Sequence, residues 1–319
     1  MRVIVLGAGG AHKTETAIAR AVRTLGHRCG HVNVVGWVRY LKGLARPVVR
    51  RLVESFAPDV LLMTRQTMWL GEATVRALAR GRRSAFWYFD LAARPLPDAV
   101  ALGRCADAMF VTYQSQLARY RAVGISNVWY LPQGLDPTAD RPVTRSPRRY
   151  QCDVSFVGAG PYPYRHDLLR AIAAACELQI RGPGWAGAPP GLPVRGGPVR
   201  GTCFAQVVHG AAICLGAHAV PEQARERGGG ASNRMWKVLG CGGFYLGAYV
   251  DGIEALARDG EHCVWYRDAD HAVELVRQYL ADPAARTRIA RAGRAHALAH
   301  HTYAHRVALL LAGRGYTST

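Results

Sequence analysis

Short apolar runs alternate with amphipathic segments along the first part of the chain. The stretch RVIVLGAGG, residues 2–10, predicts a buried strand and a glycine turn. A helix should follow, since apolar residues recur there at helical spacing: Ala17, Ile18, Ala21, Val22 and Leu25. Three more strands are predicted at residues 59–64, 84–90 and 107–112, with a helix at 71–80. This alternation predicts an α/β domain built on a doubly wound parallel sheet.

The pattern breaks near Asp136 and then starts again. Residues 135–151, LDPTADRPVTRSPRRYQ, contain three prolines and no hydrophobic period, which is typical of a linker. Beyond it, CDVSFV, LQIR, AAICLGA and GFYLGAY predict strands, and RHDLLRAIAAACE and NRMWKVLG predict helices. Two such sheets predict two domains, residues 1–145 and 146–300, that face a cleft. Ligands bind at the carboxyl ends of the strands in folds of this kind.

The composition fits two globular domains. The chain has 319 residues, of which half are hydrophobic and a fifth are charged. No apolar run approaches the roughly 20 residues that span a bilayer. The first apolar run also turns glycine-rich too early for a signal peptide. Eight cysteines are scattered without a CxxC pair, which indicates buried thiols in a reducing cytoplasm.

The formal net charge of +19 is the unusual feature of the composition. Basic residues gather in the N-terminal half. The segment WVRYLKGLARPVVRR contains no acidic residue and supplies Arg39, Lys42, Arg46, Arg50 and Arg51. A polyanion suits such a surface better than a small neutral sugar does. Two other interpretations stay open, namely peripheral contact with an anionic membrane and an arginine-rich solvated surface.

The first glycine turn, GAGGAHKTE at residues 7–15, resembles a phosphate-binding turn. Gly9 and Gly10 would let backbone N–H groups approach an anion at a helix N-terminus, with Lys13 close by. The spacing matches neither the dinucleotide fingerprint nor a P-loop. His12 would act as a general base or contact an acceptor. The alternative is an ordinary strand-to-helix turn with an exposed histidine.

A carboxylate, Asp90, ends the predicted strand SAFWYFD. At the carboxyl edge of the sheet it would face the cleft. Partial desolvation there would raise its pKa toward that of a working general base. The alternative is a carboxylate that caps the following loop.

The second sheet begins with another glycine turn, VGAGPYPYRHD. Gly158 and Gly160 would present backbone N–H groups, and Tyr162 and Arg165 open the following helix, which suits a diphosphate. The segment RGPGW then follows the next strand. Its Gly182 and Trp185 would bind a nucleobase, with the indole as a stacking plane.

A third glycine-rich segment, GGGASNRMWK, precedes a helix near residue 233. Ser232 and Asn233 are expected as N-cap residues, and Arg234 and Lys237 follow in the first turns. Positive charge is unfavourable at a helix N-terminus, and a bound anion would offset that penalty. The alternative is a glycine loop with scattered positive charge.

Several segments, in order along the chain, resemble one known family: VTYQSQLARYRAVGISNVWYLPQGLDP, DVSFVG, RGPGW, ASNRMWKVLGCGGFYL and DPAARTRIARAGRAHALAHHTYAHR. They are similar to CgeB-like glycosyltransferases, which are related to family 1 and 4 glycosyltransferases of the GT-B fold. The resemblance implies two Rossmann-like domains, with a nucleotide-sugar donor, most simply a UDP-sugar, on the C-terminal one. It also implies an acceptor on the N-terminal domain, no obligatory metal, and a last helix, within residues 301–319, that packs back on that domain.

One position departs from the family's pattern. Related enzymes carry an acidic residue four positions before the Cys-Gly, where it commonly holds the donor ribose, and this chain has Lys237 there. The acid at the start of the motif is replaced by Gly228 and Gly229. Glu222 or Glu226 would have to substitute from the adjacent loop.

The resemblance implies a hexosyltransferase-type reaction. The leaving diphosphate would be stabilised by Arg165, Ser232, Asn233, Arg234 and Lys237. Asp90, or else His12, would take the acceptor proton in an inverting reaction, whereas a retaining reaction needs no such base.

The charge of the chain suggests DNA as the acceptor, with a hydroxymethylated base flipped into the cleft. Two alternatives stay open. One is a lipid-linked, cell-surface or small-molecule acceptor, and the other is a non-catalytic nucleic-acid-binding protein on the same scaffold.

Overall fold

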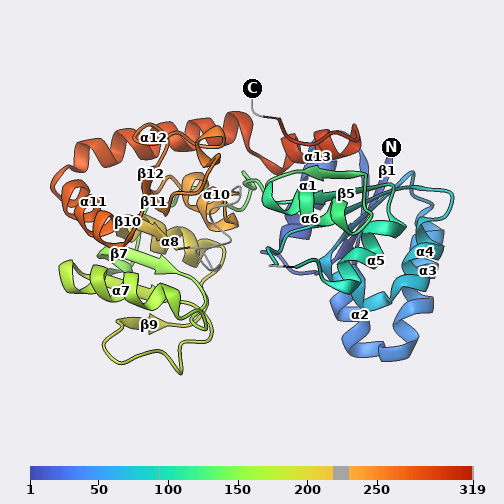
Figure 1. The fold of residues 1–319 in the computed structure, drawn as a ribbon, viewed down its shortest axis with the longest axis horizontal. Coiled ribbons are helices and arrows are strands. Elements are labelled where there is room, and N and C mark those ends of the chain that lie inside the picture. Colours follow the sequence, from blue (N-terminus) through green and yellow to red (C-terminus); the bar gives the residue numbers. More distant parts are fainter. Residues whose placement is uncertain (93, 218–229, 318–319) are drawn as a thin grey trace. The chain divides into compact units, whose positions relative to one another are not determined.

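The computed structural model describes residues 1–92, 94–217 and 230–317. The chain divides into two compact units (Figure 1). The first unit comprises Met1–Gln133 together with Tyr303–Thr319, and the second comprises Gly134–Thr302. The first unit is therefore made from both ends of the chain, and the second is continuous.

The first unit is built on a six-stranded parallel sheet. Its strand order is β2-β1-β3-β4-β5-β6. The strands are β1 (Arg2–Gly7), β2 (Arg28–Asn33), β3 (Val60–Thr64), β4 (Arg83–Tyr88), β5 (Ala108–Val111) and β6 (Val128–Tyr130). After β1 the chain forms β2 on one side of it, and then crosses over to form β3 on the other side. The topological switch point, where a crevice opens at the carboxyl ends of such strands, thus lies between β1 and β3.

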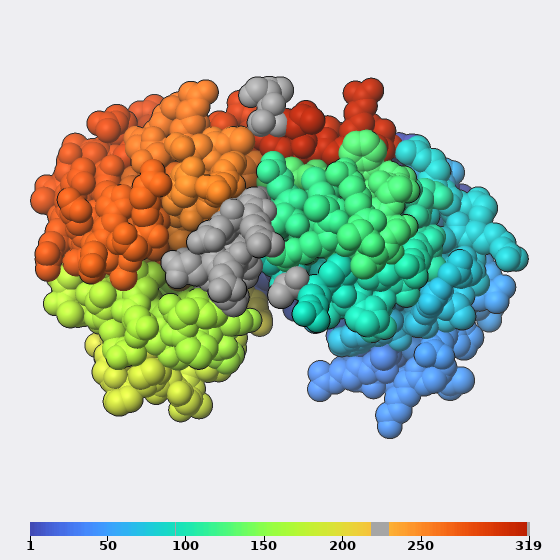
Figure 2. Space-filling model, in the orientation of Figure 1, coloured from blue at the N-terminus to red at the C-terminus, as the bar shows by residue number. Residues whose placement is uncertain are grey.

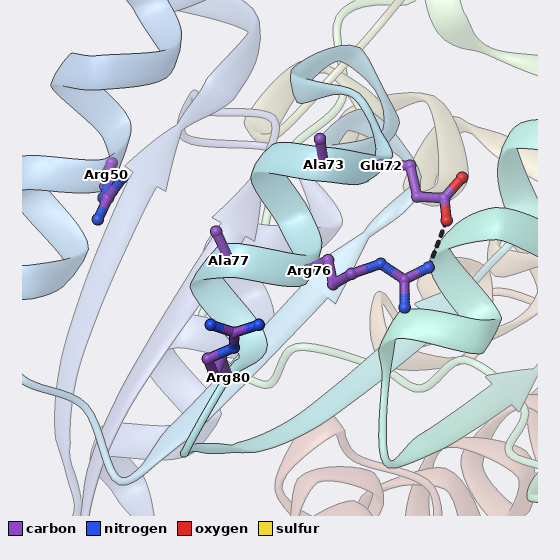
Figure 3. A pocket seen from close by; sticks show the side chains of 6 residues that line it. All are labelled: Arg50, Glu72, Ala73, Arg76, Ala77 and Arg80. Carbon is purple, nitrogen blue, oxygen red and sulfur yellow. Dashed lines mark hydrogen bonds and ion pairs between the residues drawn. The ribbon is translucent and has the colours of Figure 1, made fainter.

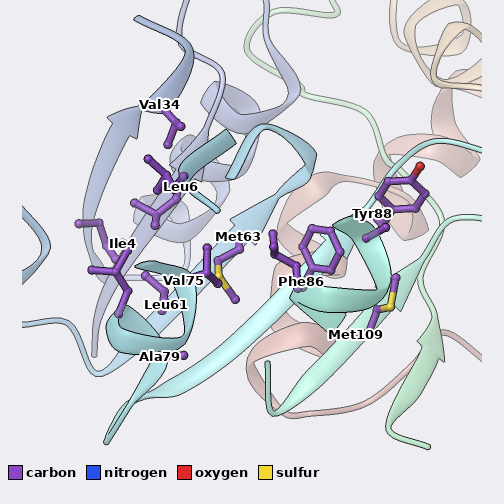
Figure 4. Packing of buried hydrophobic residues seen from close by; sticks show 14 of the residues in the cluster. Ile4, Leu6, Val34, Leu61, Met63, Val75, Ala79, Phe86, Tyr88 and Met109 are labelled. Atoms are coloured by element: carbon purple, nitrogen blue, oxygen red, sulfur yellow. The ribbon is translucent and has the colours of Figure 1, made fainter. Parts of the chain in front are cut away.

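Helices cover both faces of this sheet. They are α1 (Thr14–Thr24), α2 (Val34–Leu41), α3 (Ala45–Phe56), α4 (Glu72–Ala79), α5 (Pro97–Cys105), α6 (Ser115–Ala122) and α13 (Tyr303–Leu311), with 3-10 turns η1 (Lys42–Leu44) and η2 (Arg65–Leu70). Alternate strand residues enter different cores, as the pleat requires. Ile4 and Leu6 pack with Val75 of α4 on one face (Figure 4), and Val3 and Val5 pack with α1 on the other.

The last helix completes the second of these cores. Val307, Leu310 and Leu311 of α13 are buried in the cluster that also holds Ile18 and Trp87. Figure 1 shows α13, in red, beside the blue α1 of the first unit. Arg83 donates from Nη2 to the Leu311 carbonyl at 2.7 Å. The buried Arg306 donates from Nε to the Pro132 carbonyl at 3.0 Å. The C-terminal segment is thus an integral part of the first unit.

The predicted linker is folded onto the second unit. Leu135 donates its N–H to the His301 carbonyl at 2.9 Å, and Ser146 donates its hydroxyl to the Gln206 carbonyl at 2.7 Å. The Asp140 carboxylate accepts the N–H of Asp136 at 3.0 Å. These hydrogen bonds attach residues 135–146 to the second unit, although the segment has no hydrophobic period. The two units therefore divide after residue 133 and not at the expected residue 145.

The second unit repeats the plan with the order β12-β11-β10-β7-β8-β9, again all parallel. The strands are β7 (Cys152–Val157), β8 (Leu178–Arg181), β9 (Val194–Gly196), β10 (Ala211–Gly216), β11 (Tyr245–Ala248) and β12 (Val264–Tyr266). The helices are α7 (Tyr164–Ala175), α8 (Thr202–Gly210), α10 (Asn233–Gly240), α11 (Ala269–Ala281) and α12 (Pro283–His300), with 3-10 turns η3 (Arg148–Tyr150) and η4 (Ile253–Ala255). Here the switch point lies between β7 and β10.

Candidate functional site

Arg234 lies at the switch point of the second unit. It occupies the first turn of α10, and its guanidinium reaches back to the ends of the two strands that flank the switch. Nε donates to the carbonyl of Val157, which ends β7, and Nη1 donates to the carbonyl of Ala217, just after β10, at 3.3 Å. The guanidinium also lies 4.7 Å from the centroid of the Phe156 ring. Arg234 is thereby held where a ligand of this fold would lie.

A second arginine joins it from α7. Arg165 is buried, donates from Nη1 to the Ala159 carbonyl at 2.8 Å, and lies 4.5 Å from the centroid of the Tyr162 ring. Burial, followed by the charge of Arg234, lowers the pKa of Arg165 to about 10. Two positive charges therefore act on each other at this strand end, and a bound anion would relieve their repulsion.

The glycine turns of this unit pack against each other. Gly158 and Gly160 donate their N–H groups to the carbonyls of Arg181 and Pro183, each at 2.9 Å. A Cβ atom at Gly182 would lie 1.9 Å from the Gly158 carbonyl oxygen. The expectation that Gly158 and Gly160 offer their N–H groups to a diphosphate is therefore wrong. These glycines allow two backbone turns to come into contact.

Trp185 anchors the same two turns. Its indole N–H donates to the Gly158 carbonyl at 2.9 Å, and its ring is buried against Phe156 and His166. The expected open stacking plane for a nucleobase is therefore wrong, because protein atoms pack around the ring.

The start of α10 differs in detail from the expected cap. Ser232 is the N-cap residue by its backbone angles, but its side chain makes no capping hydrogen bond. Burial raises the pKa of the nearby Tyr245 to about 12, while the charge of Arg234 and a hydrogen bond with Ser232 oppose that rise. Asn233 Oδ1 is buried and has no hydrogen-bond partner among the described residues.

Lys237 lies one turn further along α10. Its charge lowers the pKa of the Cys241 thiol, although burial raises that pKa to about 12 overall. The expected substitutes Glu222 and Glu226, and the glycines Gly228 and Gly229, lie outside the described residues.

Asp90 of the first unit follows β4 and is ion-paired. Its Oδ2 lies 2.6 Å from Arg65 Nη1, and its side chain is 42% exposed. Gln116 Nε2 donates to the Asp90 backbone carbonyl at 2.8 Å, which fixes this strand end. The expected desolvation is therefore wrong, because the carboxylate meets an opposite charge and solvent.

A cavity of about 440 Å³ lies at the switch point of the first unit. Segments after β1, β2 and β3 line it, with Ala8, Gly9, Lys13, Asn33, Arg39, Tyr40, Arg65, Gln66 and Trp69 among its residues. Of the expected acceptor residues it brings together Gly9, Lys13 and Arg39. The sequence reasoning missed Arg65, Asn33 and Trp69, although Arg65 directly follows a predicted strand and could have been found by that position.

The first glycine turn is closed by protein groups. Gly9 donates its N–H to Asn33 Oδ1 at 2.9 Å, and the Gly10 carbonyl accepts the Thr16 hydroxyl at 2.8 Å. The N–H of Gly9 is thus already bonded, which corrects the expectation of an anion contact there. His12 is exposed on the same turn.

The other basic residues lie outside this cavity. Lys42 is in η1, and Arg46, Arg50 and Arg51 are on α3, in the blue segment that forms part of the surface in Figure 2. Arg50 faces α4 across an open groove that Arg76 and Arg80 also line (Figure 3). Arg50 pairs with Glu54 at 2.7 Å and Arg76 pairs with Glu72, so acids from neighbouring turns offset part of this charge.

Three histidines, His262, His296 and His301, contact one another beside α10. His301 stacks on Trp236 with ring centroids 4.6 Å apart, and its Nε2 lies 3.0 Å from His296 Nε2. His296 stacks in turn on His262 and contacts the Leu256 carbonyl at 2.9 Å. Burial is the main reason why the pKa values of His262 and His296 are lowered from 6.5. Burial therefore favours the neutral form of His262 and His296 over the protonated form.

Within the described parts of the chain, no three His, Cys, Asp or Glu side chains are grouped so that they would hold a metal ion. None of the helices described combines the length and apolar character needed to cross a bilayer.

Comparison with known proteins agrees with this architecture. Residues 165–312 match the model of a family described as "Glycosyl transferase-like". No curated protein matches the chain. Anabaena Alr3699/HepE, solved in complex with UDP, has a similar structure with a TM-score of 0.68, 15% identity, and coverage of 98% of this chain and 100% of that one.

Two further structures are similar. Sucrose-phosphate synthase from Thermosynechococcus elongatus gives a TM-score of 0.65 at 14% identity, covering 98% of both chains. A glycosyltransferase from Rickettsia africae gives a TM-score of 0.64 at 9% identity, covering 98% of this chain and 97% of that one. The narrower CgeB-like resemblance stays a prediction. This chain has the GT-B fold that its sequence resemblance implies, and residues 165–312 are similar to the glycosyl transferase-like family.

Proposed function

We propose that this protein is a glycosyltransferase that moves a sugar from a nucleotide-sugar donor to a hydroxyl group. The observation that carries the proposal is the pair formed by Arg165 and Arg234 at the switch point of the second unit. In glycosyl transfer the bond from the sugar to the diphosphate breaks, and negative charge develops on the leaving group. Two preorganised guanidinium groups stabilise that charge.

We further propose that the donor is a UDP-sugar. Structures of Alr3699/HepE contain UDP, UDP with glucose, and UDP-glucose, and that protein shares this fold. In this chain, the buried Asn233 Oδ1, next to Arg234 in sequence, would accept a hydrogen bond from a hydroxyl group of the UDP-sugar. Lys237, which stands where relatives have a ribose-binding acid, would leave that role to Asn233.

Asp90 is the proposed acceptor-activating base in an inverting reaction, with His12 as the alternative. Arg65 holds the Asp90 carboxylate in place through an ion pair of 2.6 Å. A retaining reaction would proceed without this base.

The proposal is tested by measuring UDP release from a panel of UDP-sugars. The wild-type chain should hydrolyse at least one donor slowly without acceptor, and the variants Arg165→Gln and Arg234→Gln should lose this activity. Arg170→Gln is the matched control, because Arg170 is exposed on the same helix as Arg165 and pairs with Asp167. Absence of nucleotide release with every donor, from a folded wild-type chain, would contradict the proposal.

A hydroxymethylated base in DNA remains a second candidate acceptor. The supporting observation is the groove between α3 and α4, which Arg50, Arg76 and Arg80 line (Figure 3). The lipid-linked, cell-surface, small-molecule and non-catalytic alternatives also stay predictions. Duplex DNA should bind with an affinity that falls steeply with salt if this candidate is correct. Binding that is absent or insensitive to salt would remove it.

We also keep the cytoplasm as the proposed location. All eight cysteines are free, which suits a reducing compartment.

A further inference from the structure

We propose that the cavity at the switch point of the first unit binds an anionic sugar, that is, a hydroxylated ring that carries a carboxylate or a phosphate group. The identification of this ligand as the acceptor rests on the function proposed above, whereas the binding itself does not.

Positive charge converges on this cavity from three strand ends. Lys13 comes from the turn after β1, Arg39 from the helix after β2, and Arg65 from the turn after β3. Asp90 neutralises Arg65. Among the described residues, neither Lys13 nor Arg39 has an ion-pair partner. The cavity therefore keeps two uncompensated cations where three strand ends meet, and an anionic group is the ligand that would neutralise them.

Exposed aromatic rings would contact the uncharged part of the ligand. Trp69 is 54% exposed and Tyr40 is 80% exposed, and both line the cavity. Large aromatic rings left exposed beside a polar cavity offer flat apolar faces to the C–H groups of a sugar ring. A bare phosphate or sulfate ion would leave these faces unused.

The side-chain amide of Asn33 would donate hydrogen bonds to the ligand. Its Oδ1 accepts the N–H groups of Gly9 and Gly36 at 2.9 Å and 3.0 Å. The oxygen is thus fully engaged by backbone. Among the described residues the Nδ2 group has no hydrogen-bond partner, so its two N–H groups would donate to a ligand hydroxyl. Gln66 supplies a second amide to the same cavity.

The size of the cavity favours a small ligand. A volume of about 440 Å³ lies in the lower part of the range found for small-molecule sites, and it suits one or two sugar rings. The arginines of α3 and α4 that would bind an extended polyanion line a different groove. Arg65 links the cavity to Asp90 at 2.6 Å, so a hydroxyl of the bound sugar would lie near the proposed base.

The test is isothermal titration of the full chain, without donor, with glucose 6-phosphate, glucuronate and glucose. We expect at least one of the two acids to bind about tenfold or more tightly than glucose. The relative affinities of the two acids then distinguish phosphate from carboxylate. Equal binding of all three sugars, or no binding of any, would overturn the proposal.

Variants locate the binding site. Arg39→Gln and Lys13→Gln should each weaken acid binding by about tenfold, whereas Arg121→Gln, an exposed arginine on α6, should not change it. Trp69→Ala should weaken the binding of glucose 6-phosphate more than the binding of inorganic phosphate. A purely electrostatic site would show no such difference. If neither charge variant alters binding, the ligand lies elsewhere and the proposal fails. Displacement of the bound sugar by duplex DNA would also overturn it.

The outcomes of the two proposals are separable. Acid binding without nucleotide release from any donor would leave this site standing and remove the transferase function. Nucleotide release without a preference for acidic sugars would support the transferase function and remove the anionic-sugar site.

Discussion

The imidazole rings of His262 and His296 lie parallel, with centroids 3.9 Å apart and planes within 7° of each other. Burial lowers the pKa of both rings below 6.5, and in His262 the neighbouring His296 lowers it further. The unfolded chain therefore binds protons more readily than the folded chain does. Stability from these groups is present above the unfolded pKa of about 6.5 and is lost as the pH falls below it.

We accordingly expect the melting temperature to fall by several degrees between about pH 7.5 and about pH 5.5. His31 of the first unit, whose pKa burial also lowers, contributes in the same direction. The variant His296→Gln should flatten this pH dependence, and His209→Gln, at an exposed position, should not. Thermal unfolding monitored by circular dichroism provides the measurement. A melting temperature that rises as the pH falls would contradict the assignment.

Removal of the Arg234 guanidinium should weaken the binding of UDP by about 1–3 kcal/mol, which is the scale of a lost charged hydrogen bond. Arg234→Ala also removes the link between Val157 and Ala217, so the comparison needs a thermal unfolding curve of the variant. Calorimetric titration with UDP is the measurement, with Arg170→Ala as control. An unchanged affinity would place the diphosphate elsewhere.

The contact between the two glycine turns should be intolerant of any side chain. Gly182 has a φ of +149°, and its Cβ would lie 1.9 Å from the Gly158 carbonyl oxygen. We expect Gly182→Ala to lower the free energy of unfolding by about 3 kcal/mol or more. Gly187→Ala is the control, because open space surrounds that position. Urea unfolding measures both, and equal stabilities would show that the turns do not pack in this way.

Asp90→Asn should abolish sugar transfer while UDP binding stays unchanged. The amide keeps the shape of the carboxylate but cannot accept the acceptor proton. Asp98→Asn, at an exposed position in the first turn of α5, serves as the control. Initial rates and UDP affinity should be measured together. A turnover that survives the first substitution would exclude Asp90 as the base and leave His12 or a retaining reaction.

Strands such as β3 and β10 were predictable because each is a nearly continuous apolar run, whereas β2 (RCGHVN) and β9 (VRG) lack such a run and were not predicted. Val60–Thr64 is buried throughout and Cys152–Val157 is buried at its three central residues, and parallel sheets covered on both faces produce that pattern. The guanidinium groups of Arg165 and Arg234 lie 5.6 Å and 4.7 Å from the centroid of the Phe156 ring, at the switch point of the second unit. Their role in donor binding stays a prediction.

What a polar group does at a strand end was not predictable from spacing. The N–H groups of Gly158 and Gly160 bond to a neighbouring turn that lies more than 20 residues further along the chain. The ion pair between Arg65 and Asp90 likewise depends on which strands are adjacent. Such pairings follow from strand order, which the hydrophobic pattern leaves undetermined.

The return of α13 to the first unit has a consequence for biosynthesis. The second unit is continuous in sequence, so all of it has been made before Tyr303 leaves the ribosome. Until then the nascent first unit exposes the apolar surface around Ile18, Leu62 and Trp87 that α13 covers. The earlier half of the protein therefore matures last, and loss of the final 17 residues would leave an exposed hydrophobic patch that favours aggregation.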